Sequence, residues 1–281
     1  MEIEFFLSCW ANEVDLATAV SCAREWGYDG AEGPPPADAG ERQEIAAEIK
    51  TQGLPYIAEI ATGGDYVPAA RLSVTKHLDD LERHLSERVA DFAPLIVNVL
   101  GGSDRWSFAE SVDFFSKGIE LAAQAGVEIC WETHRSRPTF NPWVTRDLLL
   151  ELPNIFLNCD FSHWCAVCER LVMDEEPEIL ELCAARCRHL HARVGYAQGP
   201  QVPDPRAPFY SHELESHTQW WKHLIRAADL RGSTKFSVTP EFGPDGYLQC
   251  RPFTSEPAAD LRELNRWVAG ILRNHTNAGV E

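Results

Sequence analysis

The chain has 281 residues, with 43 acidic and 25 basic side chains and a formal net charge of −18. This charge excludes nucleic acid and anionic membranes as expected partners, because an acidic surface repels phosphate groups and no basic run interrupts it. Hydrophobic residues make up 44% of the chain, a share that is typical of a globular protein with a large core.

The beginning of the sequence, MEIEFFLSCW, lacks the basic start and the cleavage site of a secretory signal. No apolar run approaches the roughly 18 residues that a membrane-spanning helix requires. The nine cysteines are odd in number and fit reduced thiols better than a disulfide framework. We therefore expect a cytoplasmic protein.

Short apolar runs alternate with helical patterns from one end of the chain to the other. The predicted strands cover residues 3–9, 28–32, 54–61, 95–101, 127–132, 155–160, 189–194 and 236–241. The predicted helices cover residues 12–26, 38–52, 68–92, 107–125, 143–152, 166–186, 213–231 and 256–273. A capping-box pattern at Ser107 and Glu110 supports one helix start, and Gly53 and Gly126 follow helix ends. The proline-rich segment 199–208, GPQVPDPRAP, is predicted to be a loop.

Eight consecutive strand-then-helix units predict parallel strands, because a helix must cross over between parallel neighbours. Eight is also the number of strands that closes a barrel of this kind. No linker or low-complexity stretch divides the chain. We therefore predict an α/β fold, a single (β/α)8 TIM-barrel domain over residues 1–281, with a doubly wound open sheet as the alternative.

The alternation of side chains along the last four strands predicts which residues point to the barrel axis. Apolar residues share one face of each strand, which packs against helices, and polar residues share the other. At the C-terminal strand ends, where barrel active sites form, the polar faces carry Glu132, Asp160, His191 and Glu241. Three buried carboxylates this close together are costly unless a cation neutralises them. The mixed oxygen and nitrogen set suits Mn²⁺, Mg²⁺, Co²⁺ or Zn²⁺.

Residues 158–168, NCDFSHWCAVC, hold two competing metal motifs. One is the D-x-x-H pair of Asp160 and His163, and the other is the C-x-x-C pair of Cys165 and Cys168. A structural zinc site needs four ligands, and no second cysteine pair completes this one. We interpret the cysteines as small apolar residues at the start of a helix. His163 is predicted to contact substrate or to orient a ligand.

Other residues near the strand ends are candidates for substrate contact, each beside a structural interpretation. His134 either orients a ligand or packs as a satisfied polar group. Arg135 and Arg137 either bind an anionic group or lie solvated in a loop. Trp10 is a candidate wall for the apolar face of a sugar, with core packing as the alternative. Glu59 either binds a distal hydroxyl group or makes structural hydrogen bonds.

Three further polar residues lie inside the predicted strands. Glu32 and Asn98, late in early strands, carry the same two interpretations as Glu59. His189 lies deeper in its strand than His191, and we predict that it is a buried structural histidine.

Four motifs resemble the xylose isomerase-like barrel superfamily. They are W-E-T-H-R (131–135), C-D-F-S-H-W (159–164), H-A-R-V-G (191–195) and T-P-E (239–241), and each falls at the end of an expected strand. The superfamily includes sugar and sugar-phosphate isomerases and epimerases, inosose dehydratases and an AP endonuclease branch. The likeness spans essentially the whole chain.

The resemblance implies that one divalent metal ion is the cofactor, with Glu132, Asp160, His191 and Glu241 as its ligands. It also implies that the two glutamates transfer protons and that His163 contacts the substrate. An arginine after the strand-seven histidine also binds substrate in the epimerase branch. Here Arg193 follows His191 by only two residues, closer than in those enzymes.

The resemblance also bears on partners. The endonuclease branch binds extra zinc through histidines at the ends of strands two and three, where this chain has Glu32 and Glu59. This difference argues against DNA repair and favours a small-molecule carbohydrate as the partner. Members of the superfamily are often dimers or tetramers, so the resemblance is compatible with a homo-oligomer.

The leading functional hypothesis is a metal-dependent isomerase or epimerase of a sugar or sugar phosphate. Such an enzyme removes a proton next to a carbonyl group and passes through a metal-stabilised enediolate. One alternative is a metal-dependent lyase or dehydratase that eliminates a β-substituent from a keto-sugar or keto-inositol. A second is a non-catalytic barrel that binds a ligand or acts as a scaffold.

Overall fold

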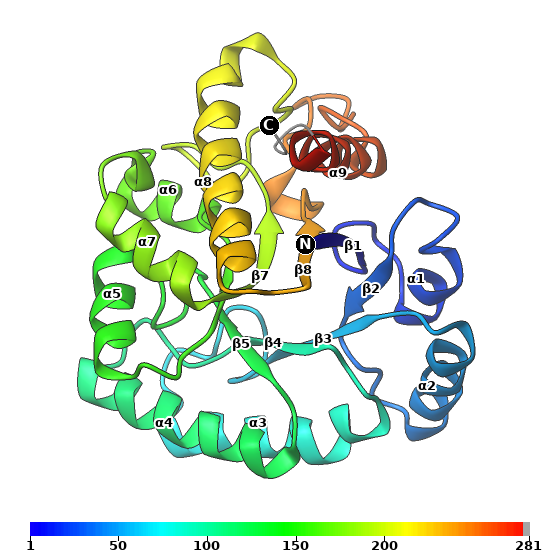
Figure 1. Ribbon diagram of the computed structural model, residues 1–281, viewed down its shortest axis with the longest axis vertical. Helices are drawn as coiled ribbons and strands as arrows, with labels where there is room; N and C mark the ends of the chain where they lie inside the picture. The colour runs from blue at the N-terminus through cyan, green and yellow to red at the C-terminus, as the bar shows by residue number, and fades with distance from the viewer. Residues whose placement is uncertain (278–281) are drawn as a thin grey trace.

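The computed structural model describes residues 1–277 and contains eight parallel strands closed into a barrel, which the helices surround (Figure 1). The strands are β1 (Glu2–Ser8), β2 (Gly30–Gly33), β3 (Tyr56–Ala61), β4 (Ile96–Leu100), β5 (Ile129–Glu132), β6 (Leu157–Cys159), β7 (Cys187–Ala192) and β8 (Lys235–Pro240). The predicted TIM barrel is confirmed. The doubly wound alternative is wrong, because β1 pairs with both β2 and β8 and the described sheet has no free edge.

Nine α-helices lie within the described residues. They are α1 (Leu16–Cys22), α2 (Ala39–Gln52), α3 (Val74–Glu87), α4 (Phe108–Ala125), α5 (Pro142–Glu151), α6 (Ser162–Cys168), α7 (Pro177–Arg186), α8 (Ser211–Leu230) and α9 (Leu261–Asn277). Short 3₁₀ helices add η1 (Val89–Asp91), η2 (Val172–Asp174), η3 (Pro208–Tyr210) and η4 (Asp245–Tyr247). The predicted helix 166–186 is divided, because Glu169 adopts a left-handed conformation that ends α6 and Pro177 begins α7.

The apolar face of β5 packs outward against helix α4, as the alternation predicts. Trp131 of β5 shows this packing, since its ring lies 5.3 Å from Phe114 and 4.9 Å from Phe115 of α4, centroid to centroid. A Cβ atom at Gly118 would come within 2.8 Å of the Trp131 ring, so α4 approaches β5 closely at this glycine. Glu132, the next residue along β5, therefore points to the barrel axis.

The nine cysteines are all free, and none of the helices within residues 1–277 is long and apolar enough to cross a membrane. Cys165 is buried on α6, with its sulfur 3.8 Å from His217 Nε2, and Cys168 is half-buried on the same helix. Neither cysteine belongs to a group of clustered metal-ligand side chains in the described part of the chain.

Candidate active site

The four residues predicted to bind a metal converge at the C-terminal mouth of the barrel. Glu132 ends β5, Asp160 directly follows β6, His191 lies in β7, and Glu241 directly follows β8. Each offers one oxygen or nitrogen atom, and these four atoms all lie within 4.8 Å of one another. All four side chains are buried. The closure of the barrel thus brings together residues that are more than 100 positions apart in the sequence.

The cluster carries an excess of negative charge. The pKa of Glu132 is raised to about 7, chiefly by burial; His191 opposes this rise, and the nearby carboxylates of Glu241 and Asp160 add to it. Burial also raises the pKa of Asp160. Burial alone would lower the pKa of His191, but the surrounding carboxylates outweigh it and hold this pKa well above its usual range. Glu132 and His191 therefore hold their protons more tightly than they would in water, and a bound cation could replace those protons.

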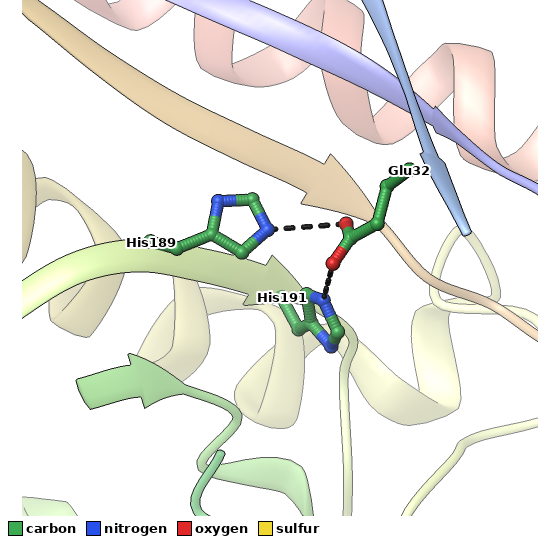
Figure 2. A group of neighbouring side chains, drawn as sticks. All are labelled: Glu32, His189 and His191. Carbon is green, nitrogen blue, oxygen red and sulfur yellow. Dashed lines mark hydrogen bonds and ion pairs between the residues drawn. The ribbon is translucent and has the colours of Figure 1, made fainter. Parts of the chain in front are cut away.

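His191 provides the clearest test of whether the site fits a metal ion. Its Nε2 atom lies 3.0 Å from Oε1 of Glu32, a carboxylate at the end of β2 (Figure 2). Its Nδ1 atom is buried and forms no aligned hydrogen bond, although it lies 3.1 Å from Oε2 of Glu241. A buried nitrogen without an aligned partner, facing three carboxylates, is a donor set that a divalent cation fits.

Arg193 lies inside this cluster rather than beside it. Its guanidinium donates to the carboxylate of Asp160 and to Oγ of Ser162, the latter at 3.1 Å. Its Nη1 atom is 3.5 Å from Oε2 of Glu241. The spacing of two residues explains this position, because alternate residues of an extended chain point to the same side and His191 already faces the axis. Arg193 therefore contacts two of the four predicted ligands.

His163 lies in the first turn of α6, fully buried beside the cluster. Its Nε2 atom is 2.8 Å from Nη2 of Arg193 and 3.6 Å from Oδ2 of Asp160. Its Nδ1 atom is 2.9 Å from Nη1 of Arg135. Burial lowers the pKa of His163 well below its usual range, so the ring is neutral near pH 7. A neutral ring between two guanidinium groups can accept only one of their hydrogen bonds.

The two remaining strand-five candidates have different roles. The ring of His134 packs against that of His163 at an interplanar angle of 55°, with centroids 4.0 Å apart, and its Nδ1 atom is 2.9 Å from Oγ of Ser136. Arg137 is fully buried, and its two terminal nitrogens donate to four backbone carbonyl groups, those of Thr62, Gly102, Asp65 and Tyr66. These four carbonyl groups belong to two loops at the barrel mouth, the one after β3 and the one after β4, so the donors of Arg137 are already occupied. The interpretation of Arg137 as an anion-binding or solvated side chain is therefore wrong.

A cavity of about 530 Å³ opens beside the ligand cluster. Five of the residues that the sequence indicates as candidates for substrate contact line it: Trp10, Glu59, His134, His163 and Arg193. Tyr66 and Tyr247 also line it and were not indicated by the sequence, because they lie in loops whose aromatic residues follow no period. Trp10 and Tyr247 pack edge to face, with centroids 5.1 Å apart, and form an aromatic wall.

Glu59 differs from the other carboxylates of the site. It lies near the end of β3 and lines the cavity, and it has no hydrogen-bond or ion-pair partner within residues 1–277. Burial raises its pKa well above the usual range, and the nearby Glu32 and Glu241 carboxylates add to this rise. Glu59 therefore holds its proton more tightly than a solvent-exposed glutamate, and in the protonated form it presents a hydrogen-bond donor to the cavity.

Comparisons with known proteins agree with the fold and with the resemblance in the sequence. A family model described as a xylose isomerase-like TIM barrel matches residues 20–268. The search of curated proteins found no match. The structure resembles a 3-keto-D-glucoside 4-epimerase, YcjR, from E. coli, with a TM-score of 0.56 and 16% identity over 96% of this chain and 99% of that chain.

Two further solved structures show the same fold. The probable 3-DHS dehydratase AsbF from Bacillus anthracis has a TM-score of 0.62 and 14% identity, over 96% of this chain and 98% of that chain. An IOLI protein with a bound zinc atom has a TM-score of 0.64 and 13% identity, over 96% of this chain and 97% of that chain. At these identities the likeness establishes the fold alone.

Proposed function

The chain belongs to the xylose isomerase-like TIM barrel family, and from this premise we propose that it is a divalent-metal-dependent isomerase or epimerase of a small sugar or sugar phosphate. The observation that carries the proposal is the buried group of Glu132, Asp160, His191 and Glu241, whose ligand atoms lie within 4.8 Å of one another beside a cavity. The zinc atom bound by the IOLI protein and the epimerase activity of YcjR support it.

The proposed residues divide the chemistry among them. A divalent cation, Mn²⁺, Mg²⁺, Co²⁺ or Zn²⁺, would supply a Lewis acid that stabilises negative charge next to a carbonyl group when a C–H proton leaves. Glu132 and Glu241, which come from different strands, remove and return that proton. Arg193 and His163 contact the substrate, and the aromatic wall of Trp10 and Tyr247 limits access of water.

A lyase or dehydratase is the second candidate, and Glu59 favours it. A protonated carboxyl group that lines the cavity can give its proton to a leaving hydroxyl group, which an elimination requires. The structural likeness to the probable dehydratase AsbF supports the same alternative.

We also propose that the protein is cytoplasmic, that residues 1–281 form a single domain and that its ligand is a small carbohydrate. Nucleic acid and membranes are not proposed partners, because the chain carries a net charge of −18. The proposal is compatible with a homo-oligomer.

The test is NMR of metal-loaded protein with a panel of ketoses, keto-sugars and their phosphates in D₂O. Solvent deuterium at a carbon that keeps all its substituents indicates an isomerase or epimerase, whereas loss of water indicates a lyase. We expect Glu132→Gln and Glu241→Gln each to abolish turnover while the fold is kept. Glu13→Gln is the matched control, since Glu13 is an exposed carboxylate at the cavity rim outside the ligand cluster. No exchange with any of the four metals would leave the non-catalytic barrel as the remaining hypothesis.

A further inference from the structure

Glu32 is not one of the four predicted ligands, yet its carboxylate lies at the centre of a buried hydrogen-bond network. Its side chain is only 1% exposed at the end of β2. Oε1 contacts Nε2 of His191 at 3.0 Å, and Oε2 contacts Nε2 of His189 at 3.1 Å, so that the carboxylate bridges the two rings (Figure 2). The hydroxyl of Thr239 on β8 also donates to Oε2.

We propose that Glu32 is a positioning residue that holds the proton of His191 on Nε2 and turns Nδ1 towards the other three ligands. A carboxylate only accepts hydrogen bonds, so the Nε2 atom that faces it must be the donor. The nitrogen that remains to bind a cation is then Nδ1, the atom that faces Glu241 at 3.1 Å. This inference rests on the proposed metal-dependent function.

The remaining contacts explain why Glu32 keeps a defined orientation. His189 lies deeper in the barrel, and its Nδ1 atom accepts a hydrogen bond from Oγ of Ser237 at 2.8 Å, which leaves Nε2 as the donor to Oε2 of Glu32. The prediction that His189 is a buried structural histidine fits this arrangement, and its role is to fix Oε2 of Glu32. The oxygen Oε1 is thereby directed at His191. Histidines that bind metals commonly donate their second N–H group to such a carboxylate, and loss of that partner typically costs about 10–100-fold in metal affinity.

The experiment is calorimetric titration of Zn²⁺ into metal-free wild-type protein and into two variants. Glu32→Gln keeps an acceptor but removes the charge, and we expect about 10-fold weaker binding. Glu32→Leu removes the acceptor, and we expect about 100-fold weaker binding. Glu4→Gln is the matched control, because Glu4 is a buried carboxylate on the neighbouring β1 that pairs with Lys235 and does not contact His191, and the dissociation constant of this variant should stay that of the wild type. Circular dichroism checks that each variant is folded. If Glu32→Leu does not fold, the comparison of Glu32→Gln with the wild type still tests the inference.

A spectroscopic measurement separates positioning from a merely structural role. In zinc-loaded wild-type protein labelled with ¹⁵N-histidine, we expect a slowly exchanging proton on Nε2 of His191 and a metal shift on Nδ1. We expect the Nε2 proton to exchange rapidly in Glu32→Leu. Zinc bound to Nε2, or two zinc ions per chain with Glu32 as a ligand, overturns the inference.

The outcomes distinguish this inference from the function on which it rests. Unchanged affinity in both Glu32 variants, with one ion bound by the wild type, overturns the role of Glu32 and leaves the metal-dependent function standing. A wild-type protein that binds none of the divalent ions overturns both.

Discussion

Replacement of Arg193 by methionine tests how the site balances its charge. Arg193 is 2% exposed and contacts the carboxylates of Asp160 and Glu241. Methionine is apolar and unbranched, so Arg193→Met removes the positive charge while it retains part of the packing. Loss of one partner of a buried ion pair costs about 3–5 kcal/mol, because the remaining charge lies in a medium that solvates it poorly. We expect the free energy of unfolding of the metal-free protein to fall by about this amount.

A bound cation should reduce this loss, since it supplies positive charge to the same two carboxylates. The measurement is urea unfolding followed by circular dichroism at about pH 8, once with EDTA and once with saturating Mn²⁺. The matched control is Arg206→Met, because Arg206 forms ion pairs with Asp204 and Glu263 near the surface. Pairs of that kind contribute about 0–1 kcal/mol.

Two results would refute this reasoning. The first is an Arg193→Met protein that is no less stable than the Arg206→Met protein. The second is a loss of the same size with and without Mn²⁺, which would mean that the arginine and the ion do not neutralise the same groups.

Three further predictions follow from the same contacts. Burial raises the folded-state pKa of Glu59 above its ordinary value of 4.5, so the folded protein holds this proton more tightly and loses stability as pH rises above that value. Glu59→Gln should therefore raise the urea midpoint of metal-free protein more at about pH 8 than at about pH 4.5, and an equal effect at both would contradict a raised pKa of Glu59. Arg137→Met leaves the buried carbonyl groups of Thr62 and Gly102 without donors. At about 1–3 kcal/mol for each, urea unfolding should show a loss of about 2–6 kcal/mol, and a loss under 1 kcal/mol would count against this role. Mn²⁺ at about 100 times its dissociation constant should add about 2.7 kcal/mol to the free energy of unfolding, and EDTA should reverse this gain. An unchanged free energy of unfolding would count against a site for this ion.

Local patterns were sufficient to predict the barrel and the inward direction of the side chains at its mouth. The direction of a side chain along a strand is a property of the backbone that repeats every two residues, so Glu132 and Asp160 could be assigned to the axis from their immediate neighbours. The divided helix at 166–186 shows the limit of such patterns. Glu169 ends α6 in a left-handed conformation that its residue type does not favour.

Contacts between strands depended on the tertiary structure. Glu32 and His191 are 159 residues apart, and nothing in their local sequences indicates that they meet. The curvature and register of the closed barrel decide that they meet. The same geometry places Arg193 beside Asp160 and directs Arg137 to backbone carbonyl groups. The sequence by itself determined which side chains face the axis, because that choice is local. Which of them touch was decided only by the closed sheet, because hydrogen bonds and ion pairs require distances of about 3 Å that only the complete packing sets.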